Sequence, residues 1–322
     1  MSNLLELRDL VTSFQTDDGW VRAVDGVSFA IEKGRTVGLV GESGCGKTVT
    51  AMSIIDLLPK PSGHVLEGSI TFGGEELREV SQKRLHELRG GEIGVIFQEP
   101  MAALNPVHRI GRQITEGLRL HRGMDARSAL QKAVELLDAV GIPEPERRVS
   151  QYPHQLSGGM RQRVMIAIAL CCEPDLLIAD EPTTALDVTV QAQILGLISK
   201  MQEELKMAVL LITHDLGVIA EQCDEVVVMY AGRIVERAPV KKLFANPRHA
   251  YTRGLLNSIP RLDHERKSML DTIPGQVAAI QDFVPGCRFC QRAGREGPTL
   301  EHRPPLQEVA EGHFIEACPE CT

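Results

Sequence analysis

The 322-residue sequence has no apolar run long enough to cross a bilayer. Its longest candidate, Val164 to Cys172, has nine residues, whereas a membrane-spanning helix needs about 20. The first residues, Met1 to Glu6, show no basic segment followed by an apolar one, so they do not resemble a secretory signal. We therefore expect a cytosolic chain that does not cross a membrane by itself.

Aromatic residues are scarce at 4%, and basic residues are not in excess. The 43 acidic residues outnumber the 35 Lys and Arg, which gives a formal net charge of −8. This balance argues against a general electrostatic attraction to nucleic acids or anionic lipids. With 43% apolar and 24% charged residues, the composition is that of a folded globular protein. The length allows two domains, or one large domain with an appendage.

Short apolar runs separated by turn residues predict antiparallel strands at 4–14, 23–31 and 69–72. The compact run 36–40 leads into a glycine-rich turn and then a helical pattern over 48–58, as a buried parallel strand leads into its crossover helix. Helix-length segments separate the further buried strands, which we expect at 93–97, 176–179, 209–213 and 226–230.

Residues 100–170 show helical periodicity without a convincing strand, which predicts a helical insertion. After about residue 260, repeated prolines break up any long element, so residues 261–322 are expected to form a separate, loop-rich module.

The segment Gly41-Glu42-Ser43-Gly44-Cys45-Gly46-Lys47-Thr48 matches the phosphate-loop pattern. Its glycines let successive N–H groups converge on phosphate oxygens, and the following helix directs its positive end to the same point. Lys47 would reach the β- and γ-phosphates, and the Thr48 hydroxyl would bind Mg²⁺. A chance glycine-rich turn is the alternative, but the strand before it and the helix after it favour a phosphate site.

Asp180 and Glu181 follow an apolar strand. Asp180 can support the metal shell, and Glu181 is the candidate for polarising the attacking water. Alone, the pair could be an ordinary acidic turn after a strand; its presence beside a phosphate loop favours catalysis.

Ser157-Gly158-Gly159 precedes a helical run and forms a second candidate anion site. A capped helix of this kind is usually structural. If this segment and the phosphate loop both bind nucleotides, one explanation is that two copies of the fold share two nucleotides.

Together these motifs resemble the ATP-binding subunits of ABC transporters over about residues 1–260. Gly41–Thr48 resembles Walker A, Leu156–Met160 the signature, Asp180 with Glu181 Walker B, and Ala185–Asp187 the D-loop, while Gln98 and His214 fall at the Q-loop glutamine and the switch histidine. The signature variant ending in Met160 looks like the dipeptide and oligopeptide importer branch. So do the segments Tyr152–Gln155, Asn246-Pro247 and Tyr251-Thr252.

The resemblance implies an α/β fold of the P-loop NTPase type. It would have a RecA-like parallel-sheet core, an N-terminal antiparallel β subdomain, a helical subdomain at about 100–170 and a small cysteine-rich C-terminal module. The ATP-binding domain would span 1–260 and the extension 261–322. Catalysis would depend on Glu181, His214, Gln98 and Lys47, and Mg²⁺ on Thr48, Gln98 and Asp180. The implied nucleotide-binding residues are Phe14, Gly41, Glu42, Ser43, Gly44, Cys45, Gly46, Lys47, Thr48, Val49, Gln98, Ser157, Gly158, Gly159, Asp180, Glu181, Asp187 and His214. Either Phe14 or Trp20 would stack on adenine.

The resemblance also implies partners: a second, related ATPase subunit, two transmembrane permeases and an extracytoplasmic peptide-binding protein, but no nucleic acid. The chain would sit on the cytoplasmic face of the inner membrane through the permeases and drive peptide uptake by hydrolysing ATP. The alternatives are a soluble ABC-type ATPase acting on nucleic acid or the ribosome, an importer of nickel or another cargo, and a redox or metal sensor. The coiled-coil or zinc inserts and the fused ATPase units that the soluble alternative predicts are not seen in the sequence.

Four of the eight cysteines fall within the last 36 residues, as Cys287-x-x-Cys290 and Cys318-x-x-Cys321. Two such turns brought together give a four-sulfur site for iron and sulfur or for zinc, and in a reducing compartment a metal is favoured over disulfides. Free thiols are a further alternative. The tail resembles that of the peptide-importer branch, which carries a [4Fe–4S] cluster, and the resemblance favours this cluster over zinc. Ala293, however, stands where the family has a cysteine, and His313 is a minor candidate ligand.

Overall fold

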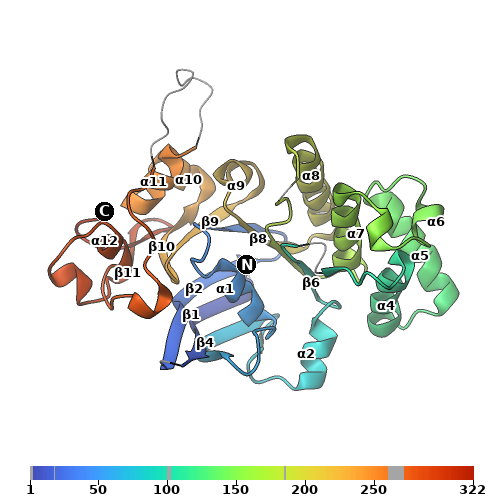
Figure 1. Cartoon of the computed structure of the whole chain (residues 1–322), viewed down its shortest axis with the longest axis horizontal. Coiled ribbons are helices and arrows are strands. Elements are labelled where there is room, and N and C mark those ends of the chain that lie inside the picture. The colour runs from blue at the N-terminus through green and yellow to red at the C-terminus, as the bar shows by residue number, and fades with distance from the viewer. Residues whose placement is uncertain (1–2, 18, 100–102, 185, 260–271) are drawn as a thin grey trace. The chain divides into compact units, whose positions relative to one another are not determined.

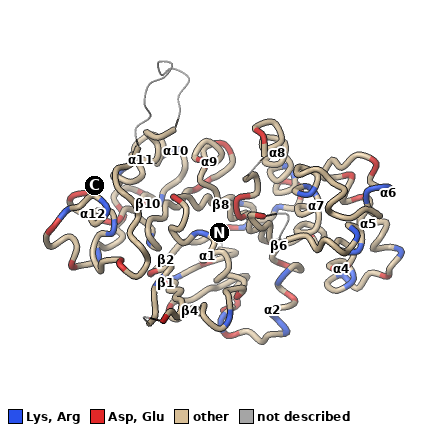
Figure 2. The backbone as a smooth tube through the Cα atoms, in the orientation of Figure 1, with Lys and Arg blue, Asp and Glu red and all other residues tan. Residues whose placement is uncertain are grey.

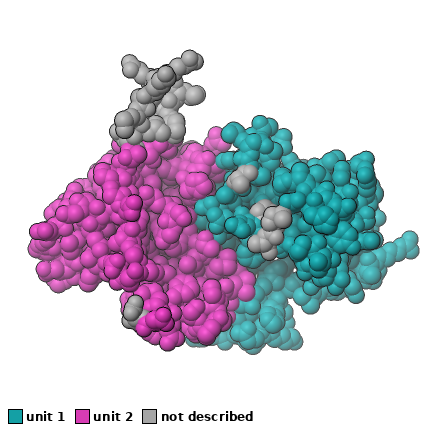
Figure 3. Space-filling model, in the orientation of Figure 1, with its two compact units in different colours: residues 1–2, 31–35, 79–212 teal, residues 3–30, 36–78, 213–322 magenta. Residues whose placement is uncertain are grey.

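The computed structural model describes residues 3–17, 19–99, 103–184, 186–259 and 272–322 (Figure 1). These residues form two compact units, which Figure 3 shows in different colours. Unit 1 contains residues 31–35 and 79–212, and unit 2 contains residues 3–30, 36–78 and 213–322. The segment that follows residue 40 therefore belongs to the same unit as the C-terminal part of the chain.

Unit 2 contains an antiparallel sheet built by the N-terminal part of the chain. Strand β1 (Asn3–Thr16) lies between β2 (Gly19–Glu32) and β4 (Gly63–Phe72), and β5 (Glu75–Glu76) pairs with β4. Along β2, Val27, Phe29 and Ile31 are buried in alternation, which is the pattern of a sheet with one face on the core. The three predicted antiparallel strands are confirmed.

A second set of strands in unit 2 follows the order β3-β9-β10-β12-β11. Only the first pair is parallel. All five residues of β3 are buried, as expected for a strand covered on both faces. The bounds are β3 (Thr36–Val40), β9 (Glu225–Tyr230), β10 (Arg233–Pro239), β11 (Leu306–Ala310) and β12 (His313–Glu316).

The turn between β9 and β10 consists of Ala231 and Gly232, whose φ angles are 47° and 83°. Two consecutive left-handed residues form the hairpin turn whose twist matches that of the adjoining strands. This turn places the backbone of Ala231 and Gly232 against the segment that follows β3, because Gly232 N–H donates to the Cys45 carbonyl at 2.9 Å.

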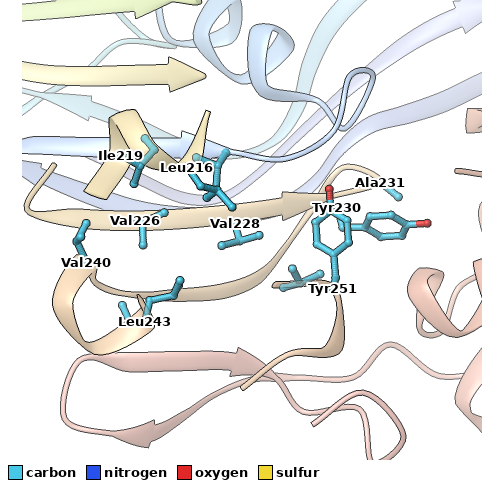
Figure 4. Close-up of a cluster of buried hydrophobic side chains, with 12 residues drawn as sticks. Leu216, Ile219, Val226, Val228, Tyr230, Ala231, Val240, Leu243 and Tyr251 are labelled. Atoms are coloured by element: carbon cyan, nitrogen blue, oxygen red, sulfur yellow. The ribbon is translucent and has the colours of Figure 1, made fainter. Parts of the chain in front are cut away.

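Helices accompany the strands of unit 2, and helical side chains such as Leu243 and Tyr251 pack with the strands in the core drawn in Figure 4. Val40 at the end of β3, Val228 on β9 and the tilted, contacting rings of Tyr230 and Tyr251 belong to this cluster. The helices are α1 (Lys47–Ile54), α9 (Leu216–Gln222), α10 (Val240–Ala245), α11 (Ala250–Asn257) and α12 (Arg288–Arg292), with short 3₁₀ turns at Ile280–Asp282 and Pro298–Leu300.

Unit 1 contains three parallel strands in the order β8-β7-β6. Their bounds are β6 (Ile93–Ile96), β7 (Leu176–Asp180) and β8 (Ala208–Thr213), so the strands predicted near these positions are confirmed. All residues of β7 and β8 are buried, since apolar side chains occupy both faces. Helices α2 (Gln82–Leu88) and α8 (Val188–Leu205) flank these strands in sequence.

The helical insertion predicted at 100–170 is present in unit 1. It comprises α4 (Ile110–Arg122), α5 (Ala126–Ala139), α6 (Pro145–Arg148), a 3₁₀ turn at Pro153–Gln155 and α7 (Gly158–Leu170). Ile110, Ile114 and Leu118 form the buried stripe of α4, which packs on α5. The start of the insertion, at residues 100–102, lies outside the described residues.

Two local predictions are corrected. The helix expected to reach residue 58 ends at Ile54, and Asp56 has a left-handed φ of 47° that a helix does not continue. The C-terminal segment also adds strands β11 and β12 that its pattern did not indicate, because every residue of β11 is exposed. The domain boundary at residue 260 lies outside the described residues and stays a prediction.

Lys and Arg are interspersed with Asp and Glu along the described chain (Figure 2). Within the described residues, no helix combines the length and the apolar character needed to span a membrane.

Candidate nucleotide and metal sites

The predicted phosphate loop lies in unit 2 between β3 and α1. Gly41, Gly44 and Gly46 have φ angles of 152°, 79° and 102°, which favour glycine. A Cβ at Gly41 would collide with the carbonyl oxygen of Met229, whereas one at Gly44 would meet nothing within 4 Å. The loop is thus closely packed at its first glycine and open at its middle one, as a phosphate cradle requires.

Lys47 begins α1 and is turned back onto its own loop. Its ammonium group donates to the carbonyl oxygens of Gly41 at 2.8 Å and Glu42 at 3.0 Å. Thr48, the next residue, is exposed, and Val49 is half-buried. The first turn of α1 combines the buried Lys47, the exposed Thr48 hydroxyl and helix N–H groups. This is the donor set that binds phosphate and Mg²⁺ in P-loop proteins.

The side chains of Ser43 and Cys45 differ in exposure. Ser43 is exposed, whereas Cys45 is buried beneath the loop. Burial raises the pKa of the Cys45 thiol, although the nearby Lys47 counteracts this effect. Cys45 therefore stays a neutral packing residue at pH 7.

Glu42 is held at two points that the sequence did not reveal. Its N–H donates to the Tyr251 hydroxyl at 2.8 Å, and its carboxylate forms a two-point ion pair with Arg292. Tyr251 belongs to the Tyr-Thr pair that resembles the importer branch, so sequence contained a signal for it. Arg292 had none, because it lies 250 residues along the chain from Glu42.

In unit 1 the end of β7 carries Asp180 and Glu181. Asp180 is buried, and Glu181 follows it in a left-handed conformation with φ 47°. A positive φ is uncommon for a residue other than glycine and is often found at functional positions.

Gln98, two residues beyond the end of β6, contacts Glu181 directly. Its side-chain amide donates to Glu181 Oε2 at 3.1 Å, and the Thr184 hydroxyl donates to the same oxygen at 2.8 Å. Two of the candidate residues, 83 residues apart in the sequence, thus contact each other.

The Ser157-Gly158-Gly159 segment also belongs to unit 1. Ser157 caps α7 by accepting a hydrogen bond from Met160 N–H at 3.4 Å. Ser157 and Gly158 are exposed, and a Cβ at Gly158 would meet nothing within 4 Å. The beginning of this helix is therefore open to an anion.

Two further candidate residues sit at helix starts. Asp187 is exposed and caps α8 by accepting from Val190 N–H at 3.0 Å; Ala185 of the same motif lies outside the described residues. His214 is exposed directly after β8, where α9 begins with its cap Asp215.

The two candidate adenine-stacking residues lie in unit 2. Phe14 is half-buried, and its ring covers Gly63 on β4 so closely that a Cβ there would come within 2.9 Å. Trp20 is 48% exposed, with its ring edge-on to His64 at 5.6 Å between centroids. Both rings belong to unit 2, which also contains the phosphate loop.

The four C-terminal cysteines come together in unit 2. Cys287 caps α12, Cys290 lies in that helix, and Cys318 and Cys321 follow β12. All four are buried, and their sulfur atoms lie within 4.8 Å of one another. Their separations exceed the roughly 2.05 Å of a disulfide, so they are free thiols suited to a shared metal.

The thiols differ in acidity. A hydrogen bond from Cys321 lowers the pKa of Cys287 to about 5, whereas burial raises the pKa of Cys318 to about 12. His313, the minor ligand candidate, does not belong to this group. Its Nε2 lies 2.7 Å from Glu236 Oε1 on β10, and the described metal-ligating group contains cysteines alone.

The comparisons with known proteins decide the family. The model of the family described as "ABC transporter" matches residues 24–184, a range that contains the phosphate loop, the Ser157-Gly158-Gly159 segment and Asp180 with Glu181. The chain belongs to the ABC transporter family. It is an ATP-hydrolysing transporter subunit of this family, with the expected mixed α/β fold.

A second family model, described as "Oligopeptide/dipeptide transporter, C-terminal region", matches residues 235–298. The chain is 48% identical to the oligopeptide transport ATP-binding protein OppD of Bacillus subtilis over 98% of its own length and 89% of that protein. It is 51% identical to a protein of Sinorhizobium fredii named as a probable peptide ABC transporter ATP-binding protein, y4tR, over 96% of this chain and 93% of that one.

Among solved structures, the chain is similar to a dimeric post-hydrolysis state of the ATP-binding cassette MJ0796 bound to ADP and phosphate. The TM-score is 0.66 and the sequence identity 27%, with 73% of this chain and 98% of that chain covered.

Proposed function

We propose that this chain is the ATP-hydrolysing motor of an importer of di- or oligopeptides. The observation that carries the proposal is the match of residues 235–298 to the C-terminal region of oligopeptide and dipeptide transporters. The names of OppD and y4tR, which are similar over nearly the whole chain, support the same cargo class. A role on nucleic acid or the ribosome is not favoured by these relatives.

In the proposed reaction Glu181 orients and polarises the water that attacks the γ-phosphate. The contact with Gln98 supports this role, because it fixes one carboxylate oxygen and leaves the side chain at a defined place. His214 is proposed to contact the γ-phosphate. Gln98 would also connect the site to the helical insertion that follows it in sequence.

Lys47 and the N–H groups of Gly41–Val49 are proposed to bind the phosphates of ATP, with Phe14 or Trp20 against adenine. Lys47 must exchange its two carbonyl partners for phosphate oxygens when ATP arrives. Mg²⁺ would be held by Thr48, Gln98 and Asp180, whose hydroxyl, amide and carboxylate oxygens are the hard ligands that this ion prefers. When bound, Mg²⁺ supplies charge neutralisation on the phosphates.

Ser157, Gly158 and Gly159 are proposed to bind the nucleotide held by a partner ATPase subunit, with Asp187 beside it. The exposure of Ser157, Gly158 and Asp187 suits contact with a second chain. The similar cassette MJ0796 is dimeric in its complex with ADP and phosphate. A related, non-identical subunit would be the partner here.

The remaining partners would be two permeases and an extracytoplasmic peptide-binding protein. The permeases would hold the chain at the cytoplasmic face of the inner membrane. We also propose that the ATP-binding domain ends at residue 260. The C-terminal extension would bind a metal, either a [4Fe–4S] cluster or zinc, through Cys287, Cys290, Cys318 and Cys321.

Uptake by cells that lack this chain tests the proposal. Three strains are compared: one without the chain, one with the wild-type chain and one with the Glu181→Gln variant. Each strain is given labelled dipeptides, longer peptides or nickel in separate experiments. Peptide uptake should require the wild-type chain and fail with Glu181→Gln. Nickel uptake that requires the wild-type chain, together with peptide uptake that does not, would contradict the proposal that peptides are the cargo.

A further inference from the structure

The C-terminal cysteines occur in two short turns with the same C-x-x-C spacing. Cys287 and Cys290 flank the first turn of α12, and Cys290 N–H donates to Cys287 Sγ at 3.4 Å. In the second loop, Cys321 N–H donates to the Cys318 carbonyl at 3.0 Å. Paired loops that present two thiolates each, at C-x-x-C spacing, are the common framework of structural zinc sites.

The distances between sulfur atoms are short. Cys287 and Cys321 are 3.7 Å apart, Cys290 and Cys318 3.5 Å, and Cys290 and Cys321 3.4 Å. No pair among the four exceeds 4.8 Å.

These distances fit one ion. Four thiolates at about 2.3 Å from a single zinc ion, arranged as a tetrahedron, lie about 3.8 Å from one another. In a [4Fe–4S] cluster each thiolate binds a different iron, so the four thiolates surround a core of eight atoms and must lie much farther apart. The described sulfur atoms leave no room for that core.

We infer that Cys287, Cys290, Cys318 and Cys321 bind a single zinc ion in a tetrahedral site, and not a [4Fe–4S] cluster. All four positions around the ion are filled by protein, so the site is structural and closed to substrate. It joins α12 to the segment after β12, 28 residues farther along the chain.

Metal analysis of the full-length chain, purified without oxygen and without added metal, tests this inference. We expect about one zinc per chain, no sulfide and no broad absorbance near 400 nm. The wild-type chain reloaded with Co²⁺ should show the visible bands of a tetrahedral cobalt–thiolate complex. Cys318→Ser should lose the zinc, while Cys223→Ser, which changes a half-buried cysteine elsewhere in unit 2, should keep it.

Four irons with sulfide per chain would overturn the inference, as would a chain that binds no metal. One iron without sulfide would overturn the choice of zinc. Each of these readouts is independent of ATP hydrolysis.

A separate observation connects the helix between these ligands to the phosphate loop. The side chain of Arg292 at the end of α12 is only 5% exposed. Its guanidinium contacts both carboxylate oxygens of Glu42, with Nη2 at 3.3 Å from Oε1. The same group donates to the carbonyl oxygens of Pro274 at 2.9 Å and Gly275 at 3.1 Å, which fix its position.

Arg288, one turn earlier on α12, is connected to the loop through the β9–β10 turn. It donates to the Ala231 carbonyl and to Asp25 at 2.7 Å, and the next residue, Gly232, donates to Cys45 of the loop. Helix α12 therefore touches the loop directly through Arg292 and indirectly through Arg288.

The charge on Glu42 gives the ion pair a functional meaning. A carboxylate in the phosphate loop repels the negative phosphates of ATP unless a cation neutralises it. Arg292 supplies that cation and holds the carboxylate toward α12. We propose that Arg292 is a positioning residue that neutralises the Glu42 carboxylate, so that this carboxylate does not weaken ATP binding. This role rests on the nucleotide site proposed above.

A double-mutant cycle tests this role. Arg292→Ala should raise KM for ATP, and the Kd of a fluorescent ATP analogue, by about tenfold with a smaller change in kcat. Adding Glu42→Gln should restore both constants, because the charge that needed neutralising is gone. Lys242→Ala, which removes another cation bound to the C-terminal segment at Glu311, serves as the matched control and should change neither.

A loss in Arg292→Ala that Glu42→Gln does not rescue would show that Arg292 is merely structural. Unchanged constants in Arg292→Ala would also overturn the proposal. Failure of the wild-type chain to bind the analogue would instead overturn the nucleotide site itself.

Discussion

The side-chain amide of Gln98 donates a hydrogen bond to Glu181 Oε2 at 3.1 Å. This contact joins a residue that follows β6 to one that follows β7, its parallel neighbour. Polar residues at the carboxyl ends of adjacent parallel strands meet in this way in many α/β sites. A change in either residue should therefore affect hydrolysis more than folding.

Glu181→Gln should reduce ATP hydrolysis by about 10²- to 10⁴-fold, the usual contribution of a general base. Nucleotide affinity should be retained, because an amide still accepts hydrogen bonds. Phosphate release and binding of a fluorescent ATP analogue measure the two effects. Glu203→Gln, an exposed position on α8, is the control. Equal hydrolysis in the two variants would remove Glu181 from the mechanism.

Ser157→Ala should lose both stability and activity. Its hydroxyl caps α7, and loss of a serine cap costs about 1 kcal/mol. Ser81 caps α2 in the same manner, through Arg84 N–H at 3.2 Å. Ser81→Ala should lose similar stability, yet only Ser157→Ala should impair hydrolysis in the assembled transporter. Denaturant unfolding and phosphate release distinguish them. Similar hydrolysis in both variants would make the Ser157 site purely structural.

Asp25→Ala should destabilise unit 2 by about 3 to 5 kcal/mol, the range for removing one partner of a buried ion pair. Asp25 is buried and lies 2.9 Å from Arg233 and 2.7 Å from Arg288. Although burial raises the pKa of Asp25, these arginines lower it overall, so the carboxyl stays ionised. In contrast, Asp175→Ala breaks an exposed pair with Lys33 and should cost at most about 1 kcal/mol. Unfolding curves that give the two variants equal losses would contradict the account.

His249 predicts a pH dependence of stability. Burial, and then the charge of Arg253, lower the pKa of His249 from 6.5 to about 3. Between pH 6.5 and pH 3 this histidine is therefore protonated in the unfolded chain but neutral in the folded chain. The free energy of unfolding consequently falls as the pH falls through this range. At pH 5 this amounts to about 2 kcal/mol, at 1.36 kcal/mol per pH unit.

The His249→Asn variant isolates this effect. His249 Nδ1 accepts from Tyr251 N–H at 3.2 Å and caps α11, and an asparagine oxygen can take over this bond. Between pH 7 and pH 5 the variant should lose about 2 kcal/mol less than the wild type. Parallel losses would mean that His249 is protonated in the folded chain.

The phosphate loop, the β7 carboxylates and the capped α7 could be predicted because each is a local pattern. A buried run before glycines predicts a strand that enters a tight turn, and a serine before two glycines predicts a capped helix start, without reference to distant residues. Strand β11 could not, because its exposed residues show no alternation of burial. The pair formed by Arg292 and Glu42 joins residues 250 apart in the sequence, a non-local contact that no local pattern specifies.

The cysteine site combines a feature that the sequence predicts with one that depends on the fold. The two C-x-x-C pairs were enough to predict four ligands, and the structure brings all four together. Their separation, which distinguishes one ion from a cluster, depends on how the two loops meet. The resemblance of the tail made His313 a minor candidate ligand, whereas in the fold this histidine pairs with Glu236.

ATP hydrolysis by the transporter reassembled in lipid vesicles tests the central claim most directly. The chain is combined with its partner ATPase and permeases, and peptide with its binding protein is supplied outside. We predict hydrolysis that rises on addition of the peptide-loaded binding protein and labelled peptide that accumulates inside, both abolished by Glu181→Gln. Hydrolysis that is the same with or without the permeases and peptide would contradict the account.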